Sequence, residues 1–130
     1  MKLLADSDFL VALYKPNDSN YRKATIIYKK IEKQASILAT NLVFQESTTV
    51  ISKKMGMASA REFYGIINKF VSERIVLNEN LESASWVIFL KQTKKGTSFV
   101  DCANLAVAEK YKLDGILSFD DFYPKELKVS

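Results

Sequence analysis

Short apolar runs alternate with longer amphipathic stretches along this chain. Runs of three or four residues, as in buried parallel strands, occupy residues 3–5, 36–39, 74–77 and 115–117. Between them, apolar residues recur at helical spacing and predict helices over residues 7–14, 21–34, 41–54, 58–72, 79–92 and 98–112. Residues 127–129 are a further candidate edge strand. This alternation predicts an α/β fold, a parallel sheet with helices on both faces, in one domain over residues 1–130.

Polar residues stand where several of these helices begin. Ser7 follows the first strand and is expected to cap the first helix, and Thr40 or Asn41 the third. Ser98, with Asp101 three residues later, fits the capping-box pattern. These strand ends and helix N-termini share one edge of the predicted sheet, which is where α/β proteins bind their ligands.

Composition removes several classes of function. The chain has no histidine, which excludes Ser-His-Asp and Cys-His catalysis and the usual zinc sites. A single cysteine, Cys102, cannot form an internal disulfide, and no secretory signal opens the sequence, so we expect a reducing, cytoplasmic location. No segment has the length and apolarity of a membrane span. The net charge of +4 is compatible with a polyanionic partner.

Four acidic residues occupy comparable places in this framework. Asp6 ends the first strand, Glu46 lies about one turn into the third helix, Asp101 lies in the first turn of the last helix, and Asp120 follows the fourth strand. Because these positions meet at one edge of a parallel sheet, we expect the four carboxylates to share a cleft. The simpler interpretation is that each pairs with a lysine or caps a helix, as Asp6 can do.

The surroundings of Glu46 favour a functional cleft. Leu42, Val43 and Val50 lie at helical spacing from it, so its charge falls on a core-facing stripe, which is costly unless it is paired or bound to a metal. Clustered carboxylates repel one another unless cations lie among them. Oxygen ligands select hard cations, so Mg²⁺ or Mn²⁺ is implied. Such ions activate water toward phosphodiesters, which makes phosphodiester hydrolysis the expected chemistry.

Four motifs follow one another along the chain: LADSDFL at residues 4–10, NLVFQE at 41–46, SFVDCANLA at 98–106 and ILSFDDF at 116–122. This ordered set resembles a PIN domain, in particular the VapC-type toxins of toxin–antitoxin pairs. The resemblance covers essentially the whole chain.

The resemblance implies a three-layer α/β/α fold and a metal-dependent endoribonuclease acting on RNA. It also implies a homodimer held inactive by a cognate antitoxin that covers the cleft. Asp6, Glu46, Asp101 and Asp120 match the family's acidic quartet. Three residues would support this quartet: Ser118, which would orient the metal shell, Asn104 and Ser7.

Two further carboxylates lie beside the motif positions. Asp8 is expected to complement the dipole of the first helix, with a direct metal role as the alternative. Asp121 is expected at the surface or behind the metal ligands, with Phe122 packing inward, and it exchanges roles with Asp120 if the last strand ends one residue later. Whether one metal ion or two are used is left open.

Other interpretations remain open at this stage. The main alternative is a non-catalytic PIN-like module that binds RNA or protein. Asp6, Asp8 and Leu10 also resemble the opening motif of haloacid-dehalogenase-type phosphatases, although Leu10 departs from its Thr or Val. A receiver domain is excluded, because Asn78 and Glu79 stand where its phospho-accepting aspartate is needed.

Basic and aromatic side chains have less specific expectations. The candidates for phosphate contact are Lys53, Lys54, Arg61, Lys94 and Lys95, of which Lys94 and Lys95 are the preferred pair. The aromatic residues Tyr14, Phe44 and Trp86 are expected in the core or at a dimer interface rather than stacking on bases.

Overall fold

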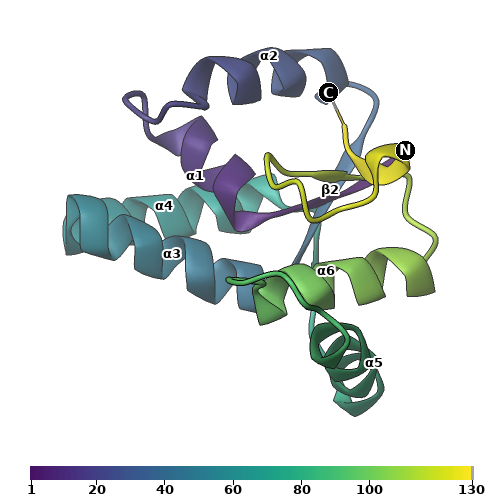
Figure 1. Ribbon diagram of the computed structural model, residues 1–130. Coiled ribbons are helices and arrows are strands. Elements are labelled where there is room, and N and C mark those ends of the chain that lie inside the picture. The colour runs from purple at the N-terminus through teal and green to yellow at the C-terminus, as the bar shows by residue number, and fades with distance from the viewer. Residues whose placement is uncertain (130) are drawn as a thin grey trace.

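Four parallel strands form the centre of the molecule (Figure 1), and their order in the sheet is β3-β2-β1-β4. The structure is a computed structural model and describes residues 1–129. The strands are β1 (Lys2–Ala5), β2 (Ser36–Thr40), β3 (Glu73–Ile75) and β4 (Gly115–Leu117). Leu4 of β1 lies opposite Leu38 of β2 and Ile116 of β4. The first strand of the chain is therefore flanked on both sides, and its carboxyl end opens in the middle of the sheet edge.

Helices cover both faces of this sheet (Figure 1). They are α1 (Ser7–Tyr14), α2 (Tyr21–Ile31), α3 (Asn41–Met55), α4 (Met57–Phe70), α5 (Glu79–Leu90), α6 (Phe99–Lys110) and the short 3₁₀ helix η1 (Lys125–Leu127). Leu3 and Ala5 point into a core cluster with residues of α1 to α4, and Leu4 points into a second cluster with residues of α5 and α6. This alternation of side chains along β1 produces three layers, so the predicted α/β/α fold is confirmed.

Side-chain caps begin the helices that lead away from the functional edge. Asp6, not Ser7, caps α1: its Oδ1 accepts a hydrogen bond of 2.8 Å from Ser7 N. Thr40 caps α3 through a 3.2 Å bond from Val43 N, and Ser98 caps α6 through a 3.0 Å bond from Val100 N. The prediction of Ser7 as cap was one residue late, because Asp6 alone separates the end of β1 at Ala5 from the start of α1 at Ser7.

The C-terminal segment differs from the expected edge strand. Residues 125–127 form η1 after Pro124, and only an isolated parallel bridge between Ile116 and Lys128 follows within residues 1–129. Gly115 allows this segment to lie against β4, because an added Cβ would come within 2.8 Å of Val129 Cγ2. The third strand is also shorter than predicted, and Val76 is 64% exposed beyond its end.

The aromatic residues singled out in the sequence pack against other rings. Tyr14 contacts Phe63 edge to face at 5.3 Å between ring centroids, and Phe44 is 4% exposed in the core. Trp86 packs on Phe99 at 4.4 Å but stays 43% exposed. Across the part of the chain that the structure describes, no helix combines the length and apolarity that a membrane crossing requires.

Candidate active site

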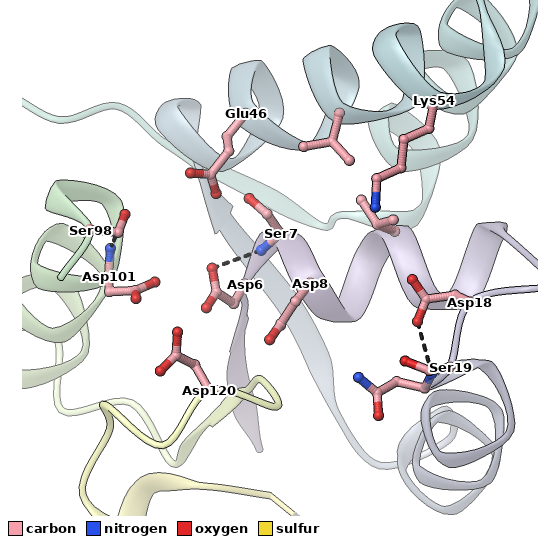
Figure 2. A pocket seen from close by; sticks show the side chains of 13 residues that line it. Asp6, Ser7, Asp8, Asp18, Ser19, Glu46, Lys54, Ser98, Asp101 and Asp120 are labelled. Atoms are coloured by element: carbon pink, nitrogen blue, oxygen red, sulfur yellow. Dashed lines mark hydrogen bonds between the residues drawn. The ribbon is translucent and has the colours of Figure 1, made fainter. Parts of the chain in front are cut away.

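The carboxyl ends of the central strands open into a pocket of about 400 Å³ (Figure 2). Asp6 lies between Glu46 of α3 on one side and Asp120 of the loop after β4 on the other, while Asp101 approaches from α6. All four residues of the predicted acidic quartet therefore line one pocket. The other lining residues are Ser7, Asp8, Val11, Asp18, Ser19, Asn20, Val50, Lys54 and Ser98.

Asp6 is the centre of a hydrogen-bond network. Its Oδ1 accepts from Ser7 N at 2.8 Å and from Asn104 Nδ2 at 3.2 Å. Its Oδ2 accepts from Ser118 Oγ and from Tyr123 OH, each at 3.0 Å. Four donors match the four lone-pair sites of a carboxylate. Burial nevertheless raises the pKa of Asp6, whose side chain lies almost entirely out of solvent.

Asp101, from α6, and Asp120, from the loop after β4, approach Asp6 from the side opposite Glu46 (Figure 2). Asp101 is 8% exposed, and its Oδ1 lies 3.1 Å from Tyr123 OH. Burial raises the pKa of Asp101 to about 8, and the charges of Asp6 and Asp120 add to the effect. Asp120 is exposed, and its Oδ1 accepts from Phe122 N at 2.9 Å, so the backbone of its own loop holds the carboxylate.

Glu46 and Ser7 complete the wall of the pocket on the α3 side. Glu46 is half-buried, as its apolar neighbours predicted, and burial raises the pKa of its carboxyl group, with a smaller contribution from the Asp6 charge. The Ser7 hydroxyl is buried without a hydrogen bond of good geometry, although it lies near enough to Glu46 to offset part of the rise in the pKa of that carboxyl group. The Glu46 carboxyl group and the Ser7 hydroxyl, which can both bind a polar ligand, therefore lie next to each other at this wall (Figure 2).

Asp8 belongs to the same cluster. Its Oδ2 accepts from Phe119 N at 3.0 Å and from Ser118 Oγ at 3.3 Å, while its Oδ1 is buried without a partner. Burial and the nearby Asp6 charge raise the pKa of Asp8 to about 7. Asp121, by contrast, is exposed, forms an ion pair of 3.5 Å with Lys128 and does not line the pocket.

Tyr123 is the residue that the sequence did not reveal. Phe122, which was expected to pack inward, is half-buried against the core cluster on the α5 and α6 side. Tyr123 is the more deeply buried ring, at 3% exposure, and the two rings pack edge to face at 5.2 Å between centroids. The Tyr123 hydroxyl contacts Asp6, Asp101 and Asn104 at 3.0 to 3.1 Å. A usable signal was present, since a buried tyrosine needs a polar partner for its hydroxyl and the predicted carboxylate cleft offered one.

The donor set fits a hard divalent cation, but not without movement. The side chains are oxygen donors, which suit Mg²⁺ or Mn²⁺, and the unpartnered oxygens of Ser7 and Asp8 are polar groups that an ion or its waters would satisfy. Within residues 1–129, however, no three acidic or cysteine side chains are arranged to hold one ion as they stand. Both oxygens of Asp6 are already occupied by donors, so an ion can reach Asp6 only if a donor moves away.

Only one of the predicted basic contacts lines this pocket. Lys54 extends from α3 at the end away from Asp101 (Figure 2). Lys94 and Lys95 are exposed in the loop before α6 and do not line the pocket, and neither do Lys53 and Arg61. Contact of Lys94 and Lys95 with a nucleic acid stays a prediction.

Two solved structures share this PIN-like fold. VapC20 of Mycobacterium tuberculosis, a toxin that cleaves the sarcin–ricin loop, superposes with a TM-score of 0.83 over 92% of this chain and 91% of its own, at 22% identity. A chain of VapBC2 from Rickettsia felis, solved with promoter DNA, superposes with a TM-score of 0.68 over 92% of this chain and 88% of its own, at 13% identity. No protein-family model and no curated protein sequence matches the chain. The predicted resemblance to VapC-type toxins is thus confirmed for the fold.

Proposed function

We propose that this protein is a Mg²⁺- or Mn²⁺-dependent endoribonuclease of the toxin type. The observation that carries the proposal is the convergence of Asp6, Glu46, Asp101 and Asp120 on one pocket, at the carboxyl edge of a parallel sheet. The chain has no histidine to activate a serine or cysteine. Hydrolysis by water at a cation held among carboxylates is the chemistry that this set of side chains supports.

Each residue has a definite part in this proposal. The quartet would hold the cation, which when bound supplies a Lewis acid beside the phosphodiester and lowers the pKa of water. Ser118 would orient Asp6 through its 3.0 Å hydrogen bond. Asn104 supports Asp6 from α6 at 3.2 Å. Ser7, unpartnered at the pocket wall, would bind water or a phosphate oxygen.

Lys54 suggests where the substrate backbone runs. Glu46, Val50 and Lys54 follow one another at intervals of four residues along the face of α3 that lines the pocket. Eight residues of helix span about 12 Å. A phosphate held by Lys54 would therefore lie in the same pocket as the carboxylates, farther along α3. One strand of RNA could contact both Lys54 and the carboxylates.

We extend the proposal to the partners that the VapC likeness implies. They are an RNA substrate, a cognate antitoxin covering the pocket, and a second copy of the chain, all in the cytoplasm. Support for the homodimer comes from α5, where Trp86, Val87 and Leu90 leave apolar side chains 43% to 75% exposed. Apolar surface of this kind favours burial against a partner.

The alternatives predict different behaviour. The saturated hydrogen bonds of Asp6 favour a non-catalytic PIN-like module that needs no metal, because the network is complete without one. The phosphatase interpretation needs Asp6 as a nucleophile, and that side chain is 4% exposed with both oxygens hydrogen-bonded. A measurement of metal binding therefore distinguishes the non-catalytic module, which needs no metal, from the nuclease, which needs one.

Cleavage of a mixed RNA pool tests the proposal. Purified protein would be assayed with Mg²⁺, with Mn²⁺ and with EDTA, beside the variant Asp101→Asn. The matched control is Asp121→Asn, because the Asp121 carboxylate directly follows Asp120 in the sequence but lies outside the pocket. We expect discrete products that need a divalent cation, survive Asp121→Asn and disappear in Asp101→Asn. Equal cleavage by Asp101→Asn would disprove the assigned site. Absence of both cleavage and Mn²⁺ binding in the wild type would favour the binding module.

A further inference from the structure

Tyr123 connects two carboxylates that the proposed function assigns to the cation. We infer that Tyr123 is a positioning residue: its hydroxyl group ties Asp101 to Asp6 and Asn104, and it sets the Asp101 carboxylate for a divalent cation by moving its hydrogen bond from Asp6 to Asp101. This inference rests on the proposed metal site. It adds a residue that lies outside the acidic quartet and outside the motifs that the sequence suggested.

The ring of Tyr123 fixes where the hydroxyl lies. It packs in the core cluster on the α5 and α6 side of the sheet, together with Leu4, Val107 and Ile116. The side chain is 3% exposed, so the hydroxyl reaches the carboxylates from the core and not from solvent. Because the ring is enclosed by packed residues, the hydroxyl group has little freedom to leave the cluster.

One proton serves two acceptors at this hydroxyl. Tyr123 OH lies 3.0 Å from Asp6 Oδ2 and 3.1 Å from Asp101 Oδ1, and it accepts from Asn104 Nδ2 at 3.1 Å. Burial raises the pKa of Tyr123, so the group keeps its proton. A hydroxyl has one proton to donate. When both carboxylates are ionised, it therefore satisfies only one of them at a time.

The donors around Asp6 show which oxygen can become free. On Oδ1, Ser7 N is fixed by the first turn of α1. On Oδ2, both donors have a second acceptor: Ser118 Oγ lies 3.3 Å from Asp8 Oδ2, and Tyr123 OH lies 3.1 Å from Asp101 Oδ1. When these two hydroxyl groups turn to their second acceptors, Asp6 Oδ2 is released, while Asp101 Oδ1 is held by Tyr123 and its other oxygen is left for the ion.

Deleting the hydroxyl group tests this arrangement without disturbing the core. Tyr123→Phe keeps the ring among its apolar neighbours but removes the hydrogen bond that holds Asp101. Groups that orient metal ligands are worth about 10- to 100-fold in metal affinity. Mn²⁺ would be titrated into wild type and Tyr123→Phe by calorimetry and by electron paramagnetic resonance of the free ion. Tyr14→Phe is the matched control, because its hydroxyl bonds Ser59 and Glu62 away from the pocket.

We expect Tyr123→Phe to bind Mn²⁺ at least 10-fold more weakly, with Tyr14→Phe unchanged. Equal or tighter binding by folded Tyr123→Phe would overturn the inference and leave the proposed nuclease intact. Failure of the wild type itself to bind Mn²⁺ would overturn both. Cleavage provides a second readout: we expect the Mg²⁺ concentration for half-maximal rate to rise for Tyr123→Phe, and the rate at saturating Mg²⁺ to recover most of its value.

A measurement on the wild type covers the case in which Tyr123→Phe does not fold. The chain has six tyrosines, and Tyr123 is the one whose hydroxyl contacts Asp6 and Asp101. With ¹³C-labelled tyrosine rings, Mg²⁺ should shift the phenol carbon signal of one tyrosine as its hydrogen bond moves, and trace Mn²⁺ should broaden that same signal. A titration in which Mg²⁺ binds and no tyrosine signal shifts would overturn the inference.

Discussion

Replacing Asp101 by asparagine should remove cleavage and, in the absence of metal, stabilise the fold. Asp101 is buried beside two other acidic residues, and its pKa rises from 3.8 to about 8. The folded state thus binds a proton that the unfolded state has lost at neutral pH. By linkage, the free energy of unfolding falls as the pH rises from about 4 to about 8.

The magnitude follows from the same two values. At pH 7 the penalty is RT ln 10 × (7 − 3.8), which is about 4 kcal/mol, starting from the ordinary pKa of 3.8. Asparagine has nearly the shape of the protonated acid and needs no proton, so Asp101→Asn avoids this penalty. Part of the gain is lost because Tyr123 and Asp120 must adjust to an amide. We expect a net gain of about 1 to 3 kcal/mol, a rise of roughly 3 to 12 °C in melting temperature.

Thermal unfolding followed by circular dichroism would measure this effect at pH 5 and pH 8. In EDTA, Asp101→Asn should melt higher than the wild type, with the larger difference at pH 8. Added Mg²⁺ should stabilise the wild type by mass action and leave the variant unchanged. The control Asp121→Asn alters an exposed ion pair and should change stability by less than about 0.5 kcal/mol. A lower melting temperature for Asp101→Asn at pH 8 in EDTA would refute this reasoning.

Other perturbations have equally definite outcomes. The apparent Mg²⁺ affinity, measured by calorimetry, should rise from pH 6 to pH 8, and proton release should accompany binding, because Asp8 and Asp101 have pKa values of about 7 and about 8. An affinity that does not change with pH would contradict the placement of these two carboxylates beside the ion. Thr40→Ala should cost about 1 kcal/mol in denaturant unfolding through loss of the α3 cap. Lys54→Gln should raise KM for RNA and leave kcat nearly unchanged, whereas a fall in kcat alone would place Lys54 at the chemistry. Phe63→Ala should cost about 3 to 5 kcal/mol, since Phe63 is 1% exposed.

The strands and the edge of the sheet could be predicted because one-dimensional patterns determine them. The run at residues 3–5 ends at Asp6, so the position of that carboxylate follows from where the apolar run stops. Glu46 and Asp101 could be assigned to the pocket because helical spacing fixes the face on which each lies. These carboxylates lie close together because the carboxyl ends of parallel strands meet at one edge of the sheet, whatever the geometry of the loops.

The details of the C-terminal loop could not be predicted in the same way. How deeply Phe122 and Tyr123 are each buried depends on the path of the chain between β4 and η1, and the loop has no periodicity to reveal it. The positions of the Lys94 and Lys95 side chains relative to the pocket could not be predicted for the same reason, since the sequence fixes no direction for an exposed loop residue. The donors to Asp6 come from residues 7, 104, 118 and 123, and only their packing sets the distances.

The central place of β1 in the sheet also determines when the site can exist during synthesis. Asp6 receives its hydrogen bonds from Ser118 and Tyr123, residues more than a hundred positions later in the chain. Pairing of β1 with β4 closes the longest loop of the fold, and such contacts form late. A nascent chain that ends before β4 contains the residues of α1 to α6, but its Asp6 lacks these two donors. Any cleavage activity therefore appears only after the C-terminal segment leaves the ribosome.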